Sequence, residues 1–235
     1  MNIISIDIGI IHLGIICAII PTNFWKNDKL IYPEDIYLCK RINIKNLIYD
    51  CNGNCKWKYH DKCITDYIMH LFEIYNFDKY DKIIIEKQPP EGITVVEELI
   101  YREYRNKTIK ISPNEMLCYF GYSYYDYEYR KTLTTKRATE YLNNHKNFHE
   151  LCDCKECIEL YKESKFIRRH DIADSFCILY YYLVKEKEIE KEKEKEKKYK
   201  KNFSSILKKL DSYKYVDDRF TRPQKSKEST TTNSI

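Results

Sequence analysis

Residues Ile3–Gly14 read IISIDIGIIHLG and combine six isoleucines with two glycines and one aspartate. The run is too short and too rich in β-branched residues for a helix, so Asn2–Ile10 is predicted to be a buried central strand. Gly9 and Gly14 interrupt the apolar stretch. Leu13–Ile20 is predicted to be a second strand that pairs with the first as a hairpin. Asp7 therefore lies in an otherwise apolar strand, where an unpaired carboxylate is costly and needs compensation.

After the hairpin, strand and helix patterns alternate along the chain. The predicted strands are Asp35–Ile44, Lys82–Lys87 and Thr108–Ser112. The predicted helices are Cys63–Tyr75, Ile93–Tyr104, a short one capped by Ser112, one from a cap at Thr134 or Thr135 to about Asn143, and Asp171–Lys185. A hairpin followed by strand–helix–strand units predicts an α/β fold with a mixed sheet, antiparallel first and parallel later.

The last part of the chain differs in composition from the rest. From Lys185 to Ile235 there are 16 basic and 10 acidic residues, whereas the other 184 residues carry 25 basic and 26 acidic ones. The alternating Lys/Glu run over 185–201 is typical of a solvated helix or a flexible stretch. We predict a folded domain over 1–184, with a Cys-rich insert near 51–63, and a charged, flexible tail over 185–235. Because the body has no basic excess, a polyanion would be held by local basic patches or by the tail.

The apolar run Ile3–Ile20 has some features of a signal peptide or a membrane span. Asp7 and His12 interrupt it, and no Lys or Arg precedes it. A signal peptide has a positive start, and a span needs about 20 apolar residues. We therefore expect no membrane partner and an intracellular location. In that reducing setting the 10 cysteines would be free or metal-bound.

Carboxylates occur at three places where strands and a helix could bring them together. Glu86 ends the apolar IIIE strand and has the same need for compensation as Asp7. Asp171 and Asp174 lie three residues apart in the first turn of a predicted helix, so they share one face of it. The helix dipole favours negative charge at this end of a helix. Each feature alone also fits an ordinary turn, ion pair or helix start. In this order along the chain they predict one acidic site.

A cluster of four carboxylates suits Mg²⁺ or Mn²⁺, which take hard oxygen ligands and leave room for water and phosphate oxygens. Two such ions can stabilise both the attacking and the leaving oxygen during phosphodiester hydrolysis. The residues therefore predict a metal-dependent nuclease.

Three segments carry a resemblance to a known family: Ile3–Gly14, Ile83–Pro89 (IIIEKQP) and His170–Ile178 (HDIADSFCI). They resemble the RuvC-like Holliday junction resolvases, in particular the poxviral and fungal-mitochondrial type. The motifs span most of residues 1–184, and the regions between them match only in predicted pattern. One departure is His12, where the family often has asparagine. The resemblance implies a ribonuclease H-like mixed five-stranded sheet flanked by helices.

The resemblance also implies an activity and its cofactors. It implies two Mg²⁺ ions, for which Mn²⁺ can substitute, held by Asp7, Glu86, Asp171 and Asp174. It implies a basic residue that contacts the scissile phosphate or a metal-bound water, for which Lys131 and Lys136 both fit and Lys136 is preferred. The implied reaction is paired nicking of four-way, branched DNA by a homodimer in recombination, repair or viral concatemer processing. A viral protein of this type would act at a replication site in the host cytoplasm, and otherwise in a mitochondrion or nucleus.

Two clusters of cysteine and histidine suggest a further cofactor. The first has the spacing C-x3-C-x4-H-x2-C, and the second is C-x-C-x2-C with His149 just upstream. Their members are Cys51, Cys55, His60 and Cys63 in the first, and Cys152, Cys154 and Cys157 in the second. Zinc takes four Cys or His ligands, and the glycine between the two cysteines of CNGNC suits the tight turn of a zinc knuckle. One mixed zinc site, two separate sites and plain reduced thiols all fit these spacings.

Basic and aromatic residues lie near the motifs. Candidate contacts to DNA phosphates are Arg130, Lys131, Arg137, Arg168 and Arg169. The segment Tyr119–Tyr129 (YFGYSYYDYEY) could stack on unpaired bases or pack in the core or a dimer contact. Packing is favoured because Asp126 and Glu128 would repel phosphate.

Three other functions fit parts of this pattern. An ATP-binding protein of the actin and sugar-kinase type shares the DxG strand, but it needs more glycine-rich turns than this chain offers. A ribonuclease H for RNA–DNA hybrids, or a general flap and junction nuclease, would use the same metal ligands. A non-catalytic, zinc-stabilised DNA-binding protein would not need all four acids.

Overall fold

A computed structural model describes residues 1–21, 25–26, 29–30, 35–44, 56–57, 59–92, 94–143 and 170–220 of the 235-residue chain. Its main sheet has five strands in the order β5-β2-β1-β6-β7. The first three strands pair antiparallel and the last two join in parallel, so the predicted mixed sheet is confirmed. The strands are β1 (Asn2–Ile8), β2 (His12–Ile19), β5 (Asp35–Asn43), β6 (Lys82–Glu86) and β7 (Thr108–Ile111). Two short strands, β3 (Trp25–Lys26) and β4 (Lys29–Leu30), pair separately.

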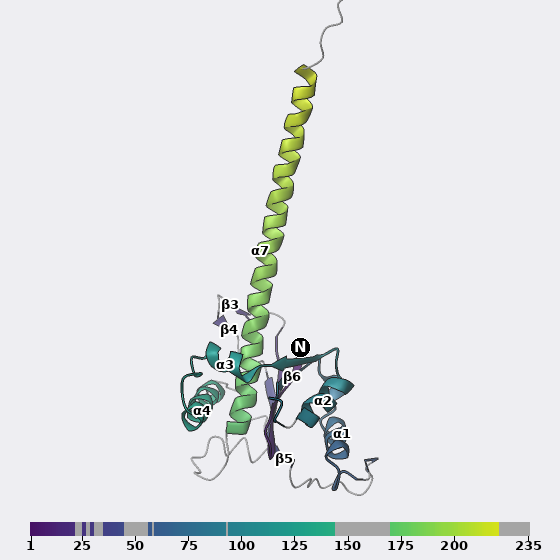
Figure 1. Cartoon of the computed structure of the whole chain (residues 1–235), viewed down its shortest axis with the longest axis vertical. Helices are drawn as coiled ribbons and strands as arrows, with labels where there is room; N and C mark the ends of the chain where they lie inside the picture. The colour runs from purple at the N-terminus through teal and green to yellow at the C-terminus, as the bar shows by residue number, and fades with distance from the viewer. Residues whose placement is uncertain are drawn as a thin grey trace, which may run out of the picture. The chain divides into compact units, whose positions relative to one another are not determined.

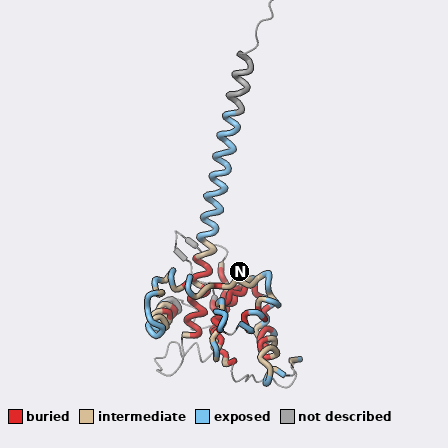
Figure 2. The backbone as a smooth tube through the Cα atoms, in the orientation of Figure 1, coloured by how far each residue is buried: buried red, intermediate tan, exposed pale blue. Residues whose placement is uncertain are grey.

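Helices cover both faces of the main sheet (Figure 1). One face carries α1 (Ile64–Ile74) and α2 (Thr94–Glu103), and the other carries α3 (Pro113–Tyr119), α4 (Tyr127–Asn143) and the start of α7 (His170–Phe220). A short 3-10 helix, η1 (Phe77–Lys79), precedes β6. Figure 2 colours the buried residues red, and they gather in the sheet and in the helices beside it.

The alternation of side chains along β1 decides which residues face the site. Ile4, Ile6 and Ile8 pack in the cluster with α1 and α2, whereas Ile3 packs in the cluster with α7. Ser5 and Asp7 share the face of Ile3 because successive strand residues point to opposite sides. The isoleucine-rich strand therefore places its polar side chains toward α7.

Close contact at Gly14 fixes the start of α7 against the sheet. A Cβ atom at this glycine would lie 1.9 Å from the Asp171 carbonyl oxygen, so only glycine fits. Gly14 is also the cross-strand partner of Asp7. The approach therefore brings the first turn of α7 next to Asp7.

Two serines complete this attachment. The Ser175 hydroxyl donates to the Asp171 carbonyl (3.0 Å) and accepts the backbone N–H of Asp7 (3.2 Å). The Ser5 hydroxyl donates to the Ser175 carbonyl at 2.7 Å. All of these groups are buried, so each hydrogen bond also avoids a desolvation penalty.

The bounds of two helices differ from the sequence expectation. Helix α4 begins at Tyr127, seven residues before the predicted cap, because the Asp126 carboxylate accepts the Tyr129 N–H at 2.9 Å. Thr134 and Thr135 lie inside the helix, where both hydroxyls donate to the Lys131 carbonyl. The predicted Ser112 cap of α3 is confirmed.

Helix α7 extends beyond the predicted Asp171–Lys185 and continues through the Lys/Glu run to Phe220, so of the two interpretations of that run the structure has the solvated helix. Most of its residues from Asp171 to Val184 are buried, and those from Glu188 to Leu210 are exposed (Figure 2). The chain divides into a first unit, residues 1–186, and a second unit, residues 187–235. None of the described helices combines the length and apolar character needed to cross a membrane.

Candidate active site

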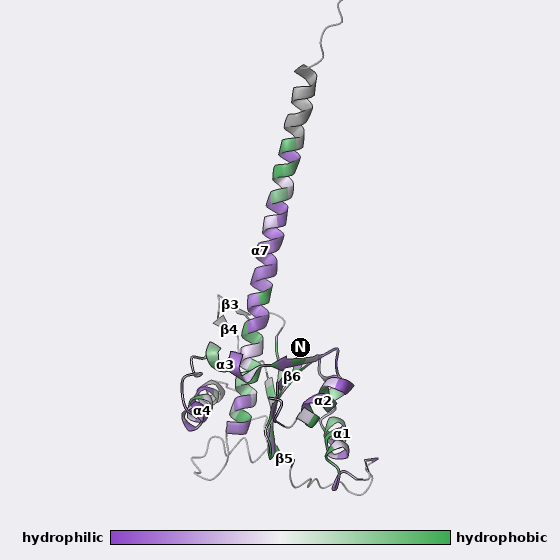
Figure 3. Ribbon diagram, in the orientation of Figure 1, coloured by the Kyte–Doolittle hydropathy of each residue, from purple (hydrophilic) through white to green (hydrophobic). Residues whose placement is uncertain are grey.

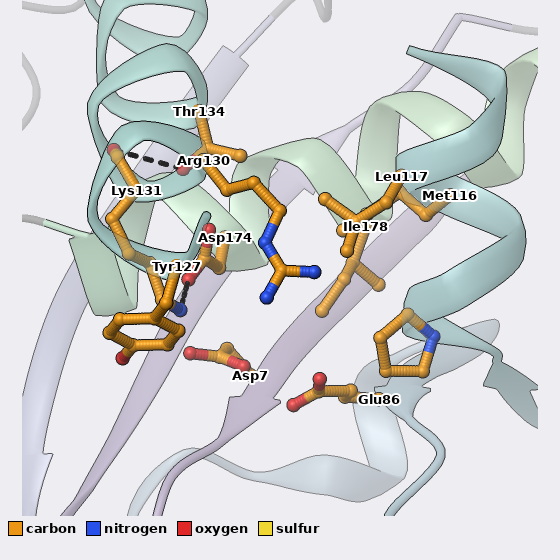
Figure 4. A pocket seen from close by; sticks show the side chains of 11 residues that line it. Asp7, Glu86, Met116, Leu117, Tyr127, Arg130, Lys131, Thr134, Asp174 and Ile178 are labelled. Atoms are coloured by element: carbon orange, nitrogen blue, oxygen red, sulfur yellow. Dashed lines mark hydrogen bonds and ion pairs between the residues drawn. The ribbon is translucent and has the colours of Figure 1, made fainter. Parts of the chain in front are cut away.

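A pocket of about 210 Å³ opens at the carboxyl ends of β1 and β6, under α3 and α4. Figure 4 shows the side chains that converge on it. Its lining residues are Asp7, Glu86, Pro113, Met116, Leu117, Tyr127, Arg130, Lys131, Thr134, Asp174 and Ile178. Three of the four predicted carboxylates are among them.

Asp7 and Glu86 form the acidic floor of this pocket. Burial raises the pKa of Asp7 well above its usual range, and the carboxylates of Glu86 and Asp174 add to the effect. Burial also raises the pKa of Glu86, although hydrogen bonds from Asp7 and Gln88 partly oppose it. The Gln88 side-chain amide donates to Glu86 Oε2 at 3.1 Å. The two acids are therefore poorly compensated by the protein itself.

Lys131 of α4 supplies the nearest positive charge. Its ammonium pairs with Asp174 Oδ2, and only 24% of its side chain is exposed (Figure 4). Burial opposes the charged form, but the carboxylates of Asp174 and Asp7 outweigh burial and raise the pKa of Lys131. One ammonium thus faces three carboxylates, and the ionised cluster carries an excess of negative charge.

Asp171 lies beside the pocket and is not part of its lining. Its Oδ1 is 3.3 Å from His170 Nε2, and its Oδ2 is 3.7 Å from His12 Nδ1. Oδ2 is buried and accepts no hydrogen bond from any residue that the structure describes. A fourth carboxylate therefore stands next to the cluster with one oxygen unsatisfied.

Lys136 and Arg137 do not reach the pocket. The Lys136 side chain is 71% exposed and lies 3.9 Å from Glu140. Arg137 donates from Nε to the Tyr122 hydroxyl (3.1 Å), and its guanidinium lies over the rings of Phe120 and Tyr122. Of the two lysines considered for the catalytic role, the structure brings Lys131 into the site.

Arg130 is the second cation at the pocket. Its side chain extends from α4 toward the space above Asp7 (Figure 4). Arg168 and Arg169, the other candidate phosphate contacts, lie outside the described residues.

The tyrosine segment divides between core and surface. Phe120 packs against the core cluster of α7, and the Tyr119 ring lies 5.5 Å from that of the buried Tyr181. Tyr124, Tyr125 and Tyr129 are exposed, and Tyr127 lines the pocket with Lys131 5.2 Å above its ring. Tyr125 and Tyr129 contact each other edge to face, with 4.8 Å between centroids. The predicted core packing therefore holds for the start of the segment and not for Tyr124, Tyr125 and Tyr129.

The zinc hypothesis falls largely outside the described residues, which include neither Cys51 and Cys55 nor the second cluster. His60 and Cys63 are described. His60 Nδ1 lies 2.8 Å from the Trp57 carbonyl, and its ring is 4.8 Å from that of His70. Cys63 immediately precedes α1 and forms no disulfide.

The acidic pocket suits a divalent cation by its charge. Its two floor acids have raised pKa values, and Asp171 Oδ2 has no hydrogen-bond donor. A cation would relieve both conditions. In the described ranges, no group of three His, Cys, Asp or Glu side chains has an arrangement that could already hold a metal ion. Binding would therefore need rotation of carboxylates and displacement of Lys131 from Asp174.

Comparison with known proteins gives no match to a protein-family model or to a curated protein sequence. Solved structures give matches. The chain is similar to Fowlpox virus resolvase in complex with Holliday junction DNA, at 18% identity, over 79% of this chain and 98% of that one, with a TM-score of 0.49. It is similar to the yeast mitochondrial Holliday junction resolvase Ydc2, at 16% identity, over 75% of this chain and 76% of that one, with a TM-score of 0.41. The chain is also similar to Thermus thermophilus RuvC, at 12% identity, over 76% of this chain and 90% of that one, with a TM-score of 0.41.

The solved neighbours are Holliday junction resolvases. At these identities the similarity concerns the fold.

Sequence reasoning missed the residues that hold the site together. Ser5 and Ser175 connect β1 to α7, and Gly14 permits the approach of the helix. A serine inside an isoleucine strand, and another four residues after Asp171, were the available signals. His12 shares the strand face of Gly14 and lies next to Asp171, which its position two residues before the glycine could have indicated.

Proposed function

We propose that this chain is a divalent-metal-dependent endonuclease that cleaves four-way DNA junctions. The observation that carries the proposal is the pocket in which Asp7, Glu86 and Asp174 surround one lysine. Three largely buried carboxylates outnumber Lys131 and Arg130, the two described cations of this pocket, and this imbalance costs folding free energy. Such an arrangement is typical of a site whose function needs the charge.

Four carboxylates would hold the ions: Asp7, Glu86, Asp174 and Asp171. When bound, Mg²⁺ or Mn²⁺ supplies an activated water and charge stabilisation for an in-line displacement at phosphorus. The protein's own part is to hold these acids on rigid elements, which the contacts of Ser5, Ser175 and Gly14 achieve. Asp7 and Glu86 have raised pKa values, so their deprotonation would accompany ion binding.

Lys131 and Arg130 would act on the DNA phosphate. Lys131 pairs with Asp174 at the pocket wall, and ion binding at Asp174 would release its ammonium to donate to a phosphate oxygen or to the attacking water. Arg130 points into the same space and can donate two parallel hydrogen bonds to a phosphate. In this proposal Lys131 takes the role that the sequence assigned to Lys136.

The choice of a four-way junction as substrate follows from the motif resemblance at Ile3–Gly14, Ile83–Pro89 and His170–Ile178. Paired cuts in a symmetric junction need two active sites, so the proposal includes a homodimer. The metal ligands alone would equally serve hydrolysis of an RNA–DNA hybrid.

Cleavage of a substrate panel tests the proposal. Purified protein with Mg²⁺ is offered an end-labelled four-way junction, the matching linear duplex and an RNA–DNA hybrid. We expect paired nicks in the junction only, and no cleavage by Asp174→Asn. Exposed Asp61→Asn serves as the matched control and should cleave normally. Cleavage of the hybrid alone would refute the junction assignment but keep the nuclease, and activity in Asp174→Asn would refute both.

We also propose that the Cys/His clusters bind structural zinc. Metal analysis of the same preparation tests this independently of cleavage. About one or two equivalents of zinc per chain are expected, and under about half an equivalent would exclude a structural site.

A further inference from the structure

The second unit contains a stretch of α7 with a composition unlike its surroundings. Residues 197–210 read KKYKKNFSSILKKL, with six lysines and no acidic residue. The preceding residues 187–196 alternate lysine and glutamate around a single isoleucine. Figure 3 shows this change along α7, from a hydrophilic stretch to one in which hydrophobic positions recur. The stretch is helical throughout.

The apolar residues of this stretch lie on one side of the helix. They are Tyr199, Phe203, Ile206, Leu207 and Leu210. At about 100° per residue these positions fall within an arc of about 100°, and the six lysines occupy the rest of the circumference. The result is a basic amphipathic helix about 20 Å long.

The apolar face is exposed. The five side chains have exposed fractions between 46% for Leu207 and 70% for Tyr199. The rings of Tyr199 and Phe203 stack nearly parallel, with 6.3 Å between centroids. A contiguous exposed apolar strip rimmed by lysines is typical of an interaction surface.

Two occupants fit this surface poorly. A second copy could use the 4-3-4 spacing of residues 199, 203, 206 and 210 as a coiled-coil seam. The positions beside that seam include Lys195, Lys200 and Lys209, which would face lysines of the second helix and repel them. DNA would engage the lysines but would leave the apolar side chains in water.

We propose that residues 197–210 bind the surface of an anionic lipid membrane. The apolar face would enter the boundary between headgroups and acyl chains, and the lysines would contact lipid phosphates and carboxylates. Tyr199 has the aromatic ring and polar hydroxyl that suit this boundary. The helix lies along the membrane and does not span it, in agreement with the hydropathy of the described helices. This inference revises the sequence expectation of no membrane partner, which considered only spanning and signal segments.

Co-sedimentation with vesicles tests the proposal on the full chain. The vesicles contain either phosphatidylcholine alone or phosphatidylcholine with about one third phosphatidylserine, at low salt. We expect binding to the anionic vesicles only. The triple variant Phe203→Gln, Ile206→Gln and Leu210→Gln should bind at least about tenfold more weakly because it removes three of the five apolar side chains and keeps all charges.

Two charge variants form a matched pair. Removing three lysines of the stretch (Lys200→Gln, Lys201→Gln, Lys208→Gln) should weaken binding on the order of a hundredfold. Removing three upstream lysines (Lys191→Gln, Lys193→Gln, Lys195→Gln) takes away the same charge and should weaken it much less. Circular dichroism checks that the variants keep their helix content.

Three results would overturn the proposal. The first is no binding to anionic vesicles at low salt. The second is equal loss in the two charge variants with no loss in the apolar variant, which would mean attraction by net charge only. The third is that the apolar and lysine variants weaken duplex-DNA binding and leave vesicle binding unchanged, which would assign the stretch to DNA.

Discussion

Asp7→Asn is expected to stabilise the metal-free protein while it removes activity. Asp7 is 6% exposed, and its carboxylate faces those of Glu86 and Asp174. The Lys131 ammonium lowers the pKa of Asp7 and opposes the effect of burial and of the neighbouring acids only in part. Asparagine keeps the size and the hydrogen-bonding ability of the side chain and removes the charge.

The magnitude follows from the charge count of the cluster. If fully ionised, the three carboxylates of the pocket would outnumber its two described cations, Lys131 and Arg130, by one charge in a largely buried site. A buried polar group without a partner costs about 1–3 kcal/mol, and a charged group costs more. We expect the substitution to add about 2 kcal/mol to the free energy of unfolding without metal. For a unit of this size that is an increase of about 4–8 °C in Tm.

Thermal unfolding in EDTA measures the effect. The exposed Asp61→Asn variant is the control and should change the stability by less than about 0.5 kcal/mol. The wild-type Tm should rise when Mg²⁺ or Mn²⁺ is added, and the Asp7→Asn Tm should not. A lower Tm for metal-free Asp7→Asn than for wild type would refute the claim that the Asp7 carboxylate destabilises the metal-free protein.

Three further predictions follow from the same geometry. Lys131→Met should lower kcat by about 10²–10³-fold, and Lys136→Met should stay within a few fold in the same junction assay, since only Lys131 lines the pocket. Gly14→Ala should lower the free energy of unfolding by about 3 kcal/mol or more in urea titration, because its Cβ would meet the Asp171 carbonyl at 1.9 Å. Gly121→Ala has open space and a φ of +73°, so it should cost only about 1–2 kcal/mol, and equal losses would contradict the packing argument. Metal-free wild type should gain stability as pH falls from 7 toward about 4, because the folded state holds protons on Asp7 and Glu86 that the unfolded state has released. If the free energy of unfolding of Asp7→Asn changes with pH as steeply as that of wild type, this assignment is contradicted.

The sequence was sufficient for the sheet because each strand carries its own signal. The isoleucine density of Asn2–Ile10 and of residues 82–87 predicts buried strands, and the Ser112 cap predicts the start of α3. The mixed pairing followed from the order of hairpin and crossover units. These are local patterns, and the structure confirms them.

Features that depend on contacts between distant residues could not be predicted in this way. Lys131 and Lys136 are alike in sequence, and they differ because α4 turns one toward Asp174 and the other toward solvent. The helix starts earlier than the threonines suggested because Asp126 caps it, a residue that the sequence reading considered only as a repulsive charge. The Gly14 contact joins residues 157 positions apart, so its meaning appears only with the helix in place.

Metal binding and cleavage measured on one preparation test the central claim most directly. Mn²⁺ is titrated into metal-free protein by calorimetry, and junction cleavage is measured over the same concentrations. We predict that binding and cleavage rise together in wild type and are both lost in Asp7→Asn and Glu86→Gln. Cleavage that persists in EDTA, or Mn²⁺ binding that both variants retain, would contradict the assignment of this pocket as the catalytic metal site.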